Sequence, residues 1–81
     1  MTEHDLYAEI SPMATKILQI SEFNSGISMT STPEWDSLAH IQLLSAIEKR
    51  FGLEISPDDA FKLTSADRLV KYLHATLKDK Q

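Results

Sequence analysis

The sequence contains no cysteine, only two glycines and three prolines, and no long apolar run. Without cysteine, neither a disulfide nor a thiolate metal site can stabilise the fold, so the chain depends on the packing of its core. No stretch approaches the roughly 18 consecutive apolar residues of a membrane-spanning helix. The first residues are acidic and lack the basic-then-apolar order of a secretory signal, so we expect a soluble protein of a reducing cytoplasm.

Basic residues are also few. The chain has eight Lys and Arg residues and twelve Asp and Glu residues, which gives a formal net charge of -4. Such a chain has no electrostatic reason to approach nucleic acid or an anionic membrane, and the basic face that a DNA-binding helical domain needs is missing. The three histidines lack the spacing of metal ligands, so no metal site is expected. With 81 residues, the chain suffices for one compact domain over 1–81 but hardly for a deep catalytic cavity. We therefore expect a monomeric domain that is not an enzyme.

No segment alternates apolar and polar residues as a half-buried strand does, whereas apolar residues recur at helical spacing in several segments. The pattern predicts an all-α fold of three longer helices and one short third helix. The predicted helices span about 5–20, 37–51, 57–62 and 65–78.

Local signals mark the ends of these predicted helices. Pro12 either kinks the first helix or opens a second one that Ser11 caps. Gly52 follows the second helix as a left-handed cap. Thr64 and Asp67 have the spacing of a capping box for the fourth helix.

A long polar segment, 21–36, separates the first two helices, and its last residues, Trp35-Asp36, lead directly into Ser37-Leu38. Isolated apolar residues in this loop indicate that it lies over the core, and we expect Trp35 to pack there. Ser37 stands where the loop meets an amphipathic helix, so its hydroxyl should be exposed. The same position is that of an ordinary helix cap. A phosphate on this hydroxyl would face the unpaired N–H groups and positive dipole of the helix end.

Asp36-Ser37-Leu38, opening a helix that ends in Glu48-Lys49-Arg50-Phe51-Gly52, resembles the acyl carrier protein family. The run from Glu54 to Thr64 is similar to that family's short third helix, and the resemblance covers about 33–73. It implies an acyl-carrier-like four-helix bundle. It also implies that a phosphopantetheinyl transferase attaches 4'-phosphopantetheine to Ser37, with Asp36 and Leu38 helping the transferase to recognise the serine. Enzymes that load and process the acyl or aminoacyl group would dock at the second helix.

The sequence departs from fatty-acid carriers, whose second helix is rich in acids. Ala39, Gln42, Lys49 and Arg50 stand at places that are usually acidic in that subgroup. We therefore expect a dedicated pathway, such as polyketide or nonribosomal peptide synthesis, with a less basic partner. A carrier of fatty-acid synthesis and an unmodified helical protein-interaction domain are the alternatives.

Two further groups of titratable residues have simpler explanations. His40, three residues after Ser37, might suggest an activated nucleophile, but no orienting third residue or oxyanion site accompanies it. We expect His40 to be a solvated helix residue and expect no catalytic residue. Asp58 and Asp59 lie in the first turn of the third helix, where the helix dipole explains them.

Overall fold

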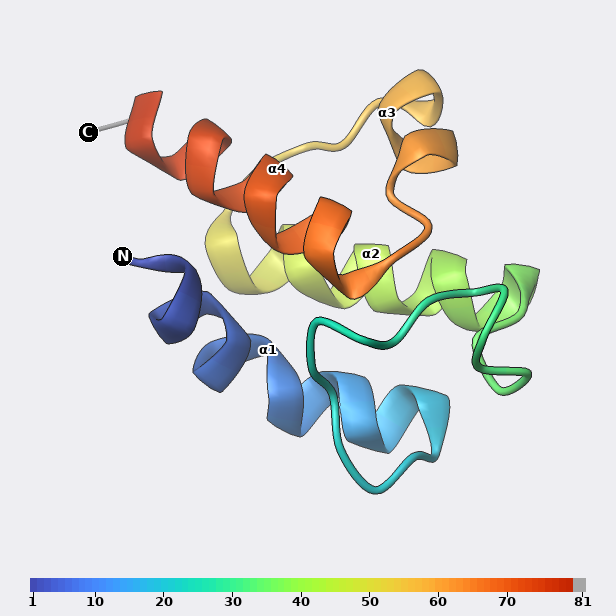
Figure 1. Ribbon diagram of the computed structural model, residues 1–81. Coiled ribbons are helices and arrows are strands. Elements are labelled where there is room, and N and C mark those ends of the chain that lie inside the picture. The colour runs from blue at the N-terminus through green and yellow to red at the C-terminus, as the bar shows by residue number, and fades with distance from the viewer. Residues whose placement is uncertain (80–81) are drawn as a thin grey trace.

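The computed structural model describes residues 1–79 and arranges them as a small helical bundle (Figure 1). Its helices are α1 (Glu3–Leu18), α2 (Ser37–Phe51), α3 (Pro57–Lys62) and α4 (Ala66–Asp79). Three longer helices and a short third one confirm the predicted all-α class. Within residues 1–79 the only strand-like pairing is an isolated antiparallel bridge between Ser28 and Ser65.

The first helix runs without a break through Pro12, so the predicted alternative of a second helix capped by Ser11 is wrong. The helix begins at Glu3 because the side chains of Thr2 and Asp5 form a reciprocal capping box. It ends two residues earlier than predicted, where Gln19 takes a left-handed conformation at φ 56°. The Ser11 hydroxyl instead donates to the carbonyl oxygen of Phe23 at 3.3 Å and so ties the following loop to the helix.

The core lies where α1 packs against α2 and α4. Leucine and isoleucine stripes from these helices meet there, and burial of this apolar area is what holds a cysteine-free domain together. Trp35 closes the core from the loop side with 1% of its surface exposed, as predicted. The fully buried large side chains are Trp35, Leu6, Ile10, Leu18, Leu43, Ile47, Leu69, Leu73 and Val70.

The loop between α1 and α2 is fixed by backbone hydrogen bonds to the segment before α4. The N–H of Met29 donates to the carbonyl of Thr64, and the N–H of Ala66 donates to the carbonyl of Ile27, both at 2.9 Å. Ser65 caps α4, because its hydroxyl accepts from the N–H of Arg68 at 3.1 Å. The predicted capping box of Thr64 and Asp67 is therefore wrong: the cap lies one residue later, at Ser65, and consists of this single side-chain hydrogen bond.

Candidate functional site

Ser37 is the first residue of α2, and it is not the residue that caps the helix. The cap is Asp36, whose Oδ1 accepts a hydrogen bond from the backbone N–H of Ala39 at 2.8 Å. The Ser37 side chain is exposed, as its position predicted. Because Asp36 takes over the capping, the Ser37 hydroxyl is left available for chemistry.

The backbone around Ser37 offers an anion a partly open helix end. Among residues 1–79, the N–H groups of Ser37 and Leu38 have no hydrogen-bond partner, while that of Ala39 is taken by Asp36. Two donors and the positive end of the helix dipole therefore face outward beside the hydroxyl. A phosphodiester on the serine oxygen is compatible with this end of the helix.

The cap gives a direct prediction about stability. Replacing Asp36 with alanine should lower the free energy of unfolding by about 1 kcal/mol, because the N–H of Ala39 loses its partner. Asp36→Asn retains a good capping oxygen and should stay close to the original value. Urea unfolding monitored by circular dichroism measures both. Equal losses in the two variants would assign the effect to the charge of Asp36 instead of the cap.

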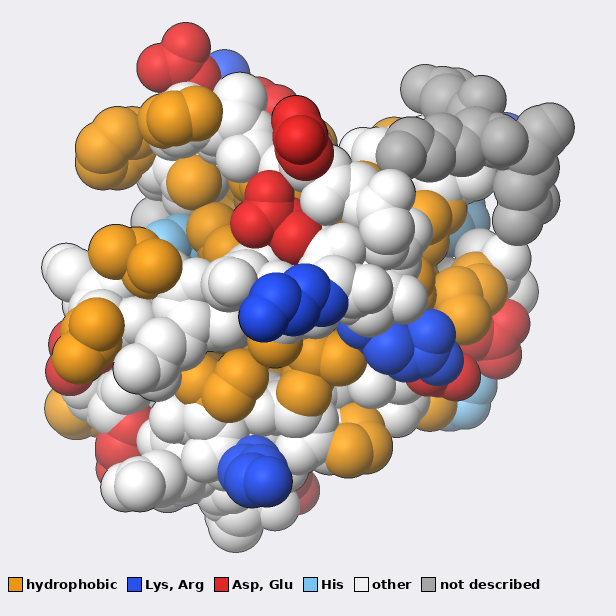
Figure 2. All heavy atoms as spheres, turned by 180° about the vertical axis from the view of Figure 1, so that it is seen from behind, with side chains coloured by type: hydrophobic (Ala, Val, Ile, Leu, Met, Phe, Trp, Pro, Cys, Tyr) orange, Lys and Arg blue, Asp and Glu red, His pale blue; other side chains and the backbone are white. Residues whose placement is uncertain are grey.

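Large hydrophobic side chains lie exposed on either side of this helix start. Leu38 and Ile41 on α2 are each 65% exposed, and Phe61 on α3 is 82% exposed. Seen from behind, hydrophobic side chains gather at the end of the molecule that holds α3 and the start of α2 (Figure 2). Most of the Lys and Arg side chains seen in that view lie nearer its middle. Three exposed apolar side chains near one modifiable hydroxyl are typical of a contact surface.

The outer face of α2 carries no free carboxylate. Its one acidic residue, Glu48, is half-buried and accepts a hydrogen bond from the N–H of Ile55 at 2.8 Å. Arg50 forms an ion pair with Glu9 of α1. From the sequence, Ala39 was expected to be a surface position at which an acidic residue is missing. Ala39 is buried, so it has no bearing on the charge of that face.

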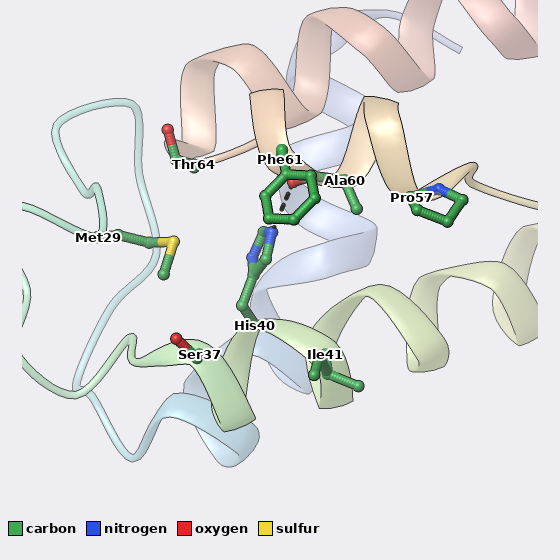
Figure 3. Close-up of a pocket in the computed structure, with 8 residues that line it drawn as sticks. All are labelled: Met29, Ser37, His40, Ile41, Pro57, Ala60, Phe61 and Thr64. Carbon is green, nitrogen blue, oxygen red and sulfur yellow. Dashed lines mark hydrogen bonds between the residues drawn. The ribbon is translucent and has the colours of Figure 1, made fainter.

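An apolar pocket of about 410 Å³ opens beside Ser37 between α2 and α3 (Figure 3). Ser37, His40 and Ile41 form its α2 side, and the α3 side comes from residues 57–61. Met29 reaches in from the loop. The full lining consists of Met29, Ser37, His40, Ile41, Pro57, Ala60, Phe61 and Thr64. The pocket combines segments distant in sequence, so sequence reasoning did not find it.

His40 is buried, with 9% of its surface exposed, so the prediction of a solvated residue is wrong. The indole N–H of Trp35 donates to its Nδ1 at 3.0 Å, and its Nε2 lies 2.9 Å from the carbonyl oxygen of Ala60. Both ring nitrogens are thus occupied, and neither is available to take a proton from Ser37. The signal was present in the sequence, since His40 precedes Leu43, Leu44 and Ile47 at helical spacing.

Two other kinds of site find no support in the described part of the chain. Residues 1–79 contain no group of three or more His, Cys, Asp or Glu side chains that could hold a metal ion. None of the helices described is long and apolar enough to cross a membrane. Asp58 and Asp59 sit in the first turn of α3, as predicted, behind the cap residue Ser56.

Comparison with known proteins gives matches that include this site. The family model described as the phosphopantetheine attachment site matches residues 35–73. An acyl carrier protein of Lactobacillus johnsonii is 28% identical over 75 residues, which cover 90% of this chain and 94% of that protein.

The two matches indicate a covalently attached phosphopantetheine group, and the exposed hydroxyl, open N–H groups and apolar pocket are compatible with one. Neither match is to an enzyme, since one is a phosphopantetheine attachment site and the other an acyl carrier protein. In these matches and in its four-helix architecture, the chain is similar to the phosphopantetheine-attachment, or acyl carrier, family.

Proposed function

We propose that this protein is an acyl carrier whose phosphopantetheine is attached through the hydroxyl oxygen of Ser37. The observation that carries the proposal is the position of this hydroxyl. It is exposed, it belongs to the first residue of α2, and it is not needed to cap the helix because Asp36 does so. The apolar pocket that Ser37 borders adds a sheltered surface next to the attachment point.

A phosphopantetheinyl transferase would supply the group from coenzyme A. The Ser37 oxygen forms a bond to the phosphorus that bears pantetheine, the pyrophosphate bond breaks, and adenosine bisphosphate leaves while the hydroxyl proton passes to the transferase. When bound, the group provides a thiol that carries cargo as a thioester. This chain contributes the anchor oxygen, the two open N–H groups of Ser37 and Leu38, and the surface that partners contact.

We further propose that the carrier serves a dedicated biosynthetic pathway, such as polyketide or nonribosomal peptide synthesis. The support is the outer face of α2, where Leu38, Ile41 and Gln42 are exposed and Glu48 is engaged by a backbone N–H. A face without free carboxylates gains little from a basic partner, so a partner with an apolar docking surface fits better. A carrier for fatty-acid synthesis is the alternative, and it requires docking to basic patches.

Intact mass spectrometry tests the attachment. Incubation with coenzyme A, magnesium and a broad-specificity phosphopantetheinyl transferase should raise the mass of the original chain by one phosphopantetheinyl group. Ser37→Ala should show no gain, because only the acceptor oxygen has been removed from an exposed position. Ser45→Ala, also exposed on α2, is the matched control and should gain the full mass. A gain that persists in Ser37→Ala, or no gain with several transferases, would refute the proposed attachment.

A further inference from the structure

The pocket beside Ser37 is apolar and directly borders the proposed attachment point. Its volume is about 410 Å³, and most of the side chains that line it are apolar. Ile41 on α2 and Phe61 on α3 line it while remaining 65% and 82% exposed, so they stand at its mouth. Such a pocket favours an apolar group that is tethered to Ser37 at short reach.

The ring of His40 closes the inner side of this pocket. It lines the pocket although only 9% of the residue is exposed, and it extends from α2 toward Ala60 on α3 (Figure 3). The indole N–H of Trp35 donates to its Nδ1 at 3.0 Å, and its Nε2 lies 2.9 Å from the carbonyl oxygen of Ala60. Two hydrogen bonds to different segments therefore hold the ring in place as the floor of the pocket.

Behind this floor, the core is filled with aromatic rings. Trp35 is 1% exposed and does not line the pocket, and its ring centroid lies 5.8 Å from that of His40 and 6.2 Å from that of Phe23. The Phe23 ring in turn lies 6.0 Å from the Tyr7 ring. A group that moved from the pocket toward Trp35 would have to displace His40 and leave the buried indole N–H without its partner. Entry into the core in this direction is therefore unfavourable.

The phosphopantetheine arm has an apolar part close to its anchor. Only the phosphate and one methylene separate the serine oxygen from a carbon that bears two methyl groups, whereas two amide groups lie between that carbon and the thiol. These methyl groups are thus the first apolar part of the arm that reaches a pocket beside Ser37. Placing the cargo there instead requires the arm to fold back along its length, which closes a larger loop and orders more bonds.

We infer that the pocket holds the dimethyl carbon of the arm, and that His40 and Trp35 keep the cargo out of the core. The inference rests on the proposed attachment to Ser37. It places the thioester and its cargo in solvent, where this domain does not limit their size or polarity. The enzymes that load and process the cargo then select it, and the carrier does not.

Proteins that carry the arm with different cargo test the inference by NMR. A broad-specificity transferase with coenzyme A, butyryl-coenzyme A or octanoyl-coenzyme A gives three forms, and intact mass confirms each. In every form, the two methyl groups of the arm should show nuclear Overhauser contacts with Ile41 and Ala60. The methyl shifts of Leu43 and Leu63, which are buried in the core, should be the same in the butyryl and octanoyl forms. Contacts of the octanoyl chain with these two leucines, or arm methyl groups without contacts in the pocket, would overturn the inference.

Cleavage of the thioester measures the exposure of the cargo independently. Hydroxylamine should release the butyryl and octanoyl groups at rates within about twofold of each other, because cargo in solvent is not shielded from the nucleophile. A larger slowing of octanoyl release would show that the carrier shelters long chains, contrary to the inference.

Variants of His40 test its role as the floor of the pocket. His40→Ala opens a way toward Trp35, so octanoyl release should become slower than butyryl release. His40→Gln can accept from Trp35 and donate to Ala60, so it should keep the two rates equal. Simple loss of packing would expose both cargoes alike and would not produce this contrast. Equal rates in a folded His40→Ala variant would refute the role of His40, and the comparison of cargoes on the original chain still decides if that variant does not fold.

Ile41→Ser tests the contact with the arm. The methyl resonances of the arm should return toward their positions in free coenzyme A. Leu38→Ser is the matched control, since Leu38 is equally exposed on α2 but does not line the pocket, and it should leave these resonances unchanged. Equal changes in both variants would place the arm outside the pocket. Absence of the mass gain would refute the attachment to Ser37, whereas a mass gain without the pocket contacts would refute this inference alone.

Discussion

Replacing Trp35 with alanine should lower the free energy of unfolding by about 3–5 kcal/mol, the range found for large aromatic side chains removed from a core. The side chain is 1% exposed and fills the space between the loop and the helices. Its ring lies 6.2 Å from that of Phe23 and 5.8 Å from that of His40, measured between centroids. Since domains of this kind are stable by only about 5–15 kcal/mol, the variant should lose a large share of its stability.

Trp35→Phe is the matched control for this loss. Phenylalanine keeps an aromatic ring in the core but cannot donate to Nδ1 of His40, so we expect a smaller loss of about 1–3 kcal/mol. Urea unfolding followed by circular dichroism compares the variants without relying on the missing tryptophan. A loss under about 1 kcal/mol in Trp35→Ala would mean that the loop end does not close the core, contrary to its burial.

The helices were predictable because their signals are local. The second helix combines an apolar stripe with a cap at each end, Asp36 and Gly52, and its predicted bounds agree with the structure. Gly52 adopts φ 65°, where glycine is favoured. Predictions failed where a tertiary contact chose between neighbouring signals. Ser65 rather than Thr64 caps α4, since the carbonyl of Thr64 is engaged by Met29 of the loop.

The exposure of Ser37 was likewise a local property, set by its place at the start of an amphipathic helix. The pocket was not, because Met29, Phe61 and Thr64 reach it from segments whose arrangement depends on the whole fold. His40 lies between the two cases. Its helical register predicts burial, but only the folded chain shows that Trp35 and Ala60 satisfy both of its nitrogens.

The exposed apolar residues of α2 give the second large prediction. Leu38→Glu should reduce kcat/KM for transfer of phosphopantetheine by about tenfold or more, which corresponds to about 1.4 kcal/mol of lost transition-state binding. Leu38 is 65% exposed and adjacent to the proposed acceptor, so a docked transferase would cover it. Covering a carboxylate without a partner is costly, whereas covering leucine is favourable. The measurement is the initial rate of modification at carrier concentrations well below KM.

The fold should not be affected, because a carboxylate in the first turn of α2 interacts favourably with the helix dipole. Leu38→Gln separates the loss of apolar contact from the added charge and should fall between the original chain and Leu38→Glu. Ala8→Glu adds the same charge at an exposed position on α1 and should be modified at the original rate. Equal slowing by Leu38→Glu and Ala8→Glu would trace the effect to net charge. An unchanged rate in Leu38→Glu would show that the transferase reaches the serine without covering this side of α2.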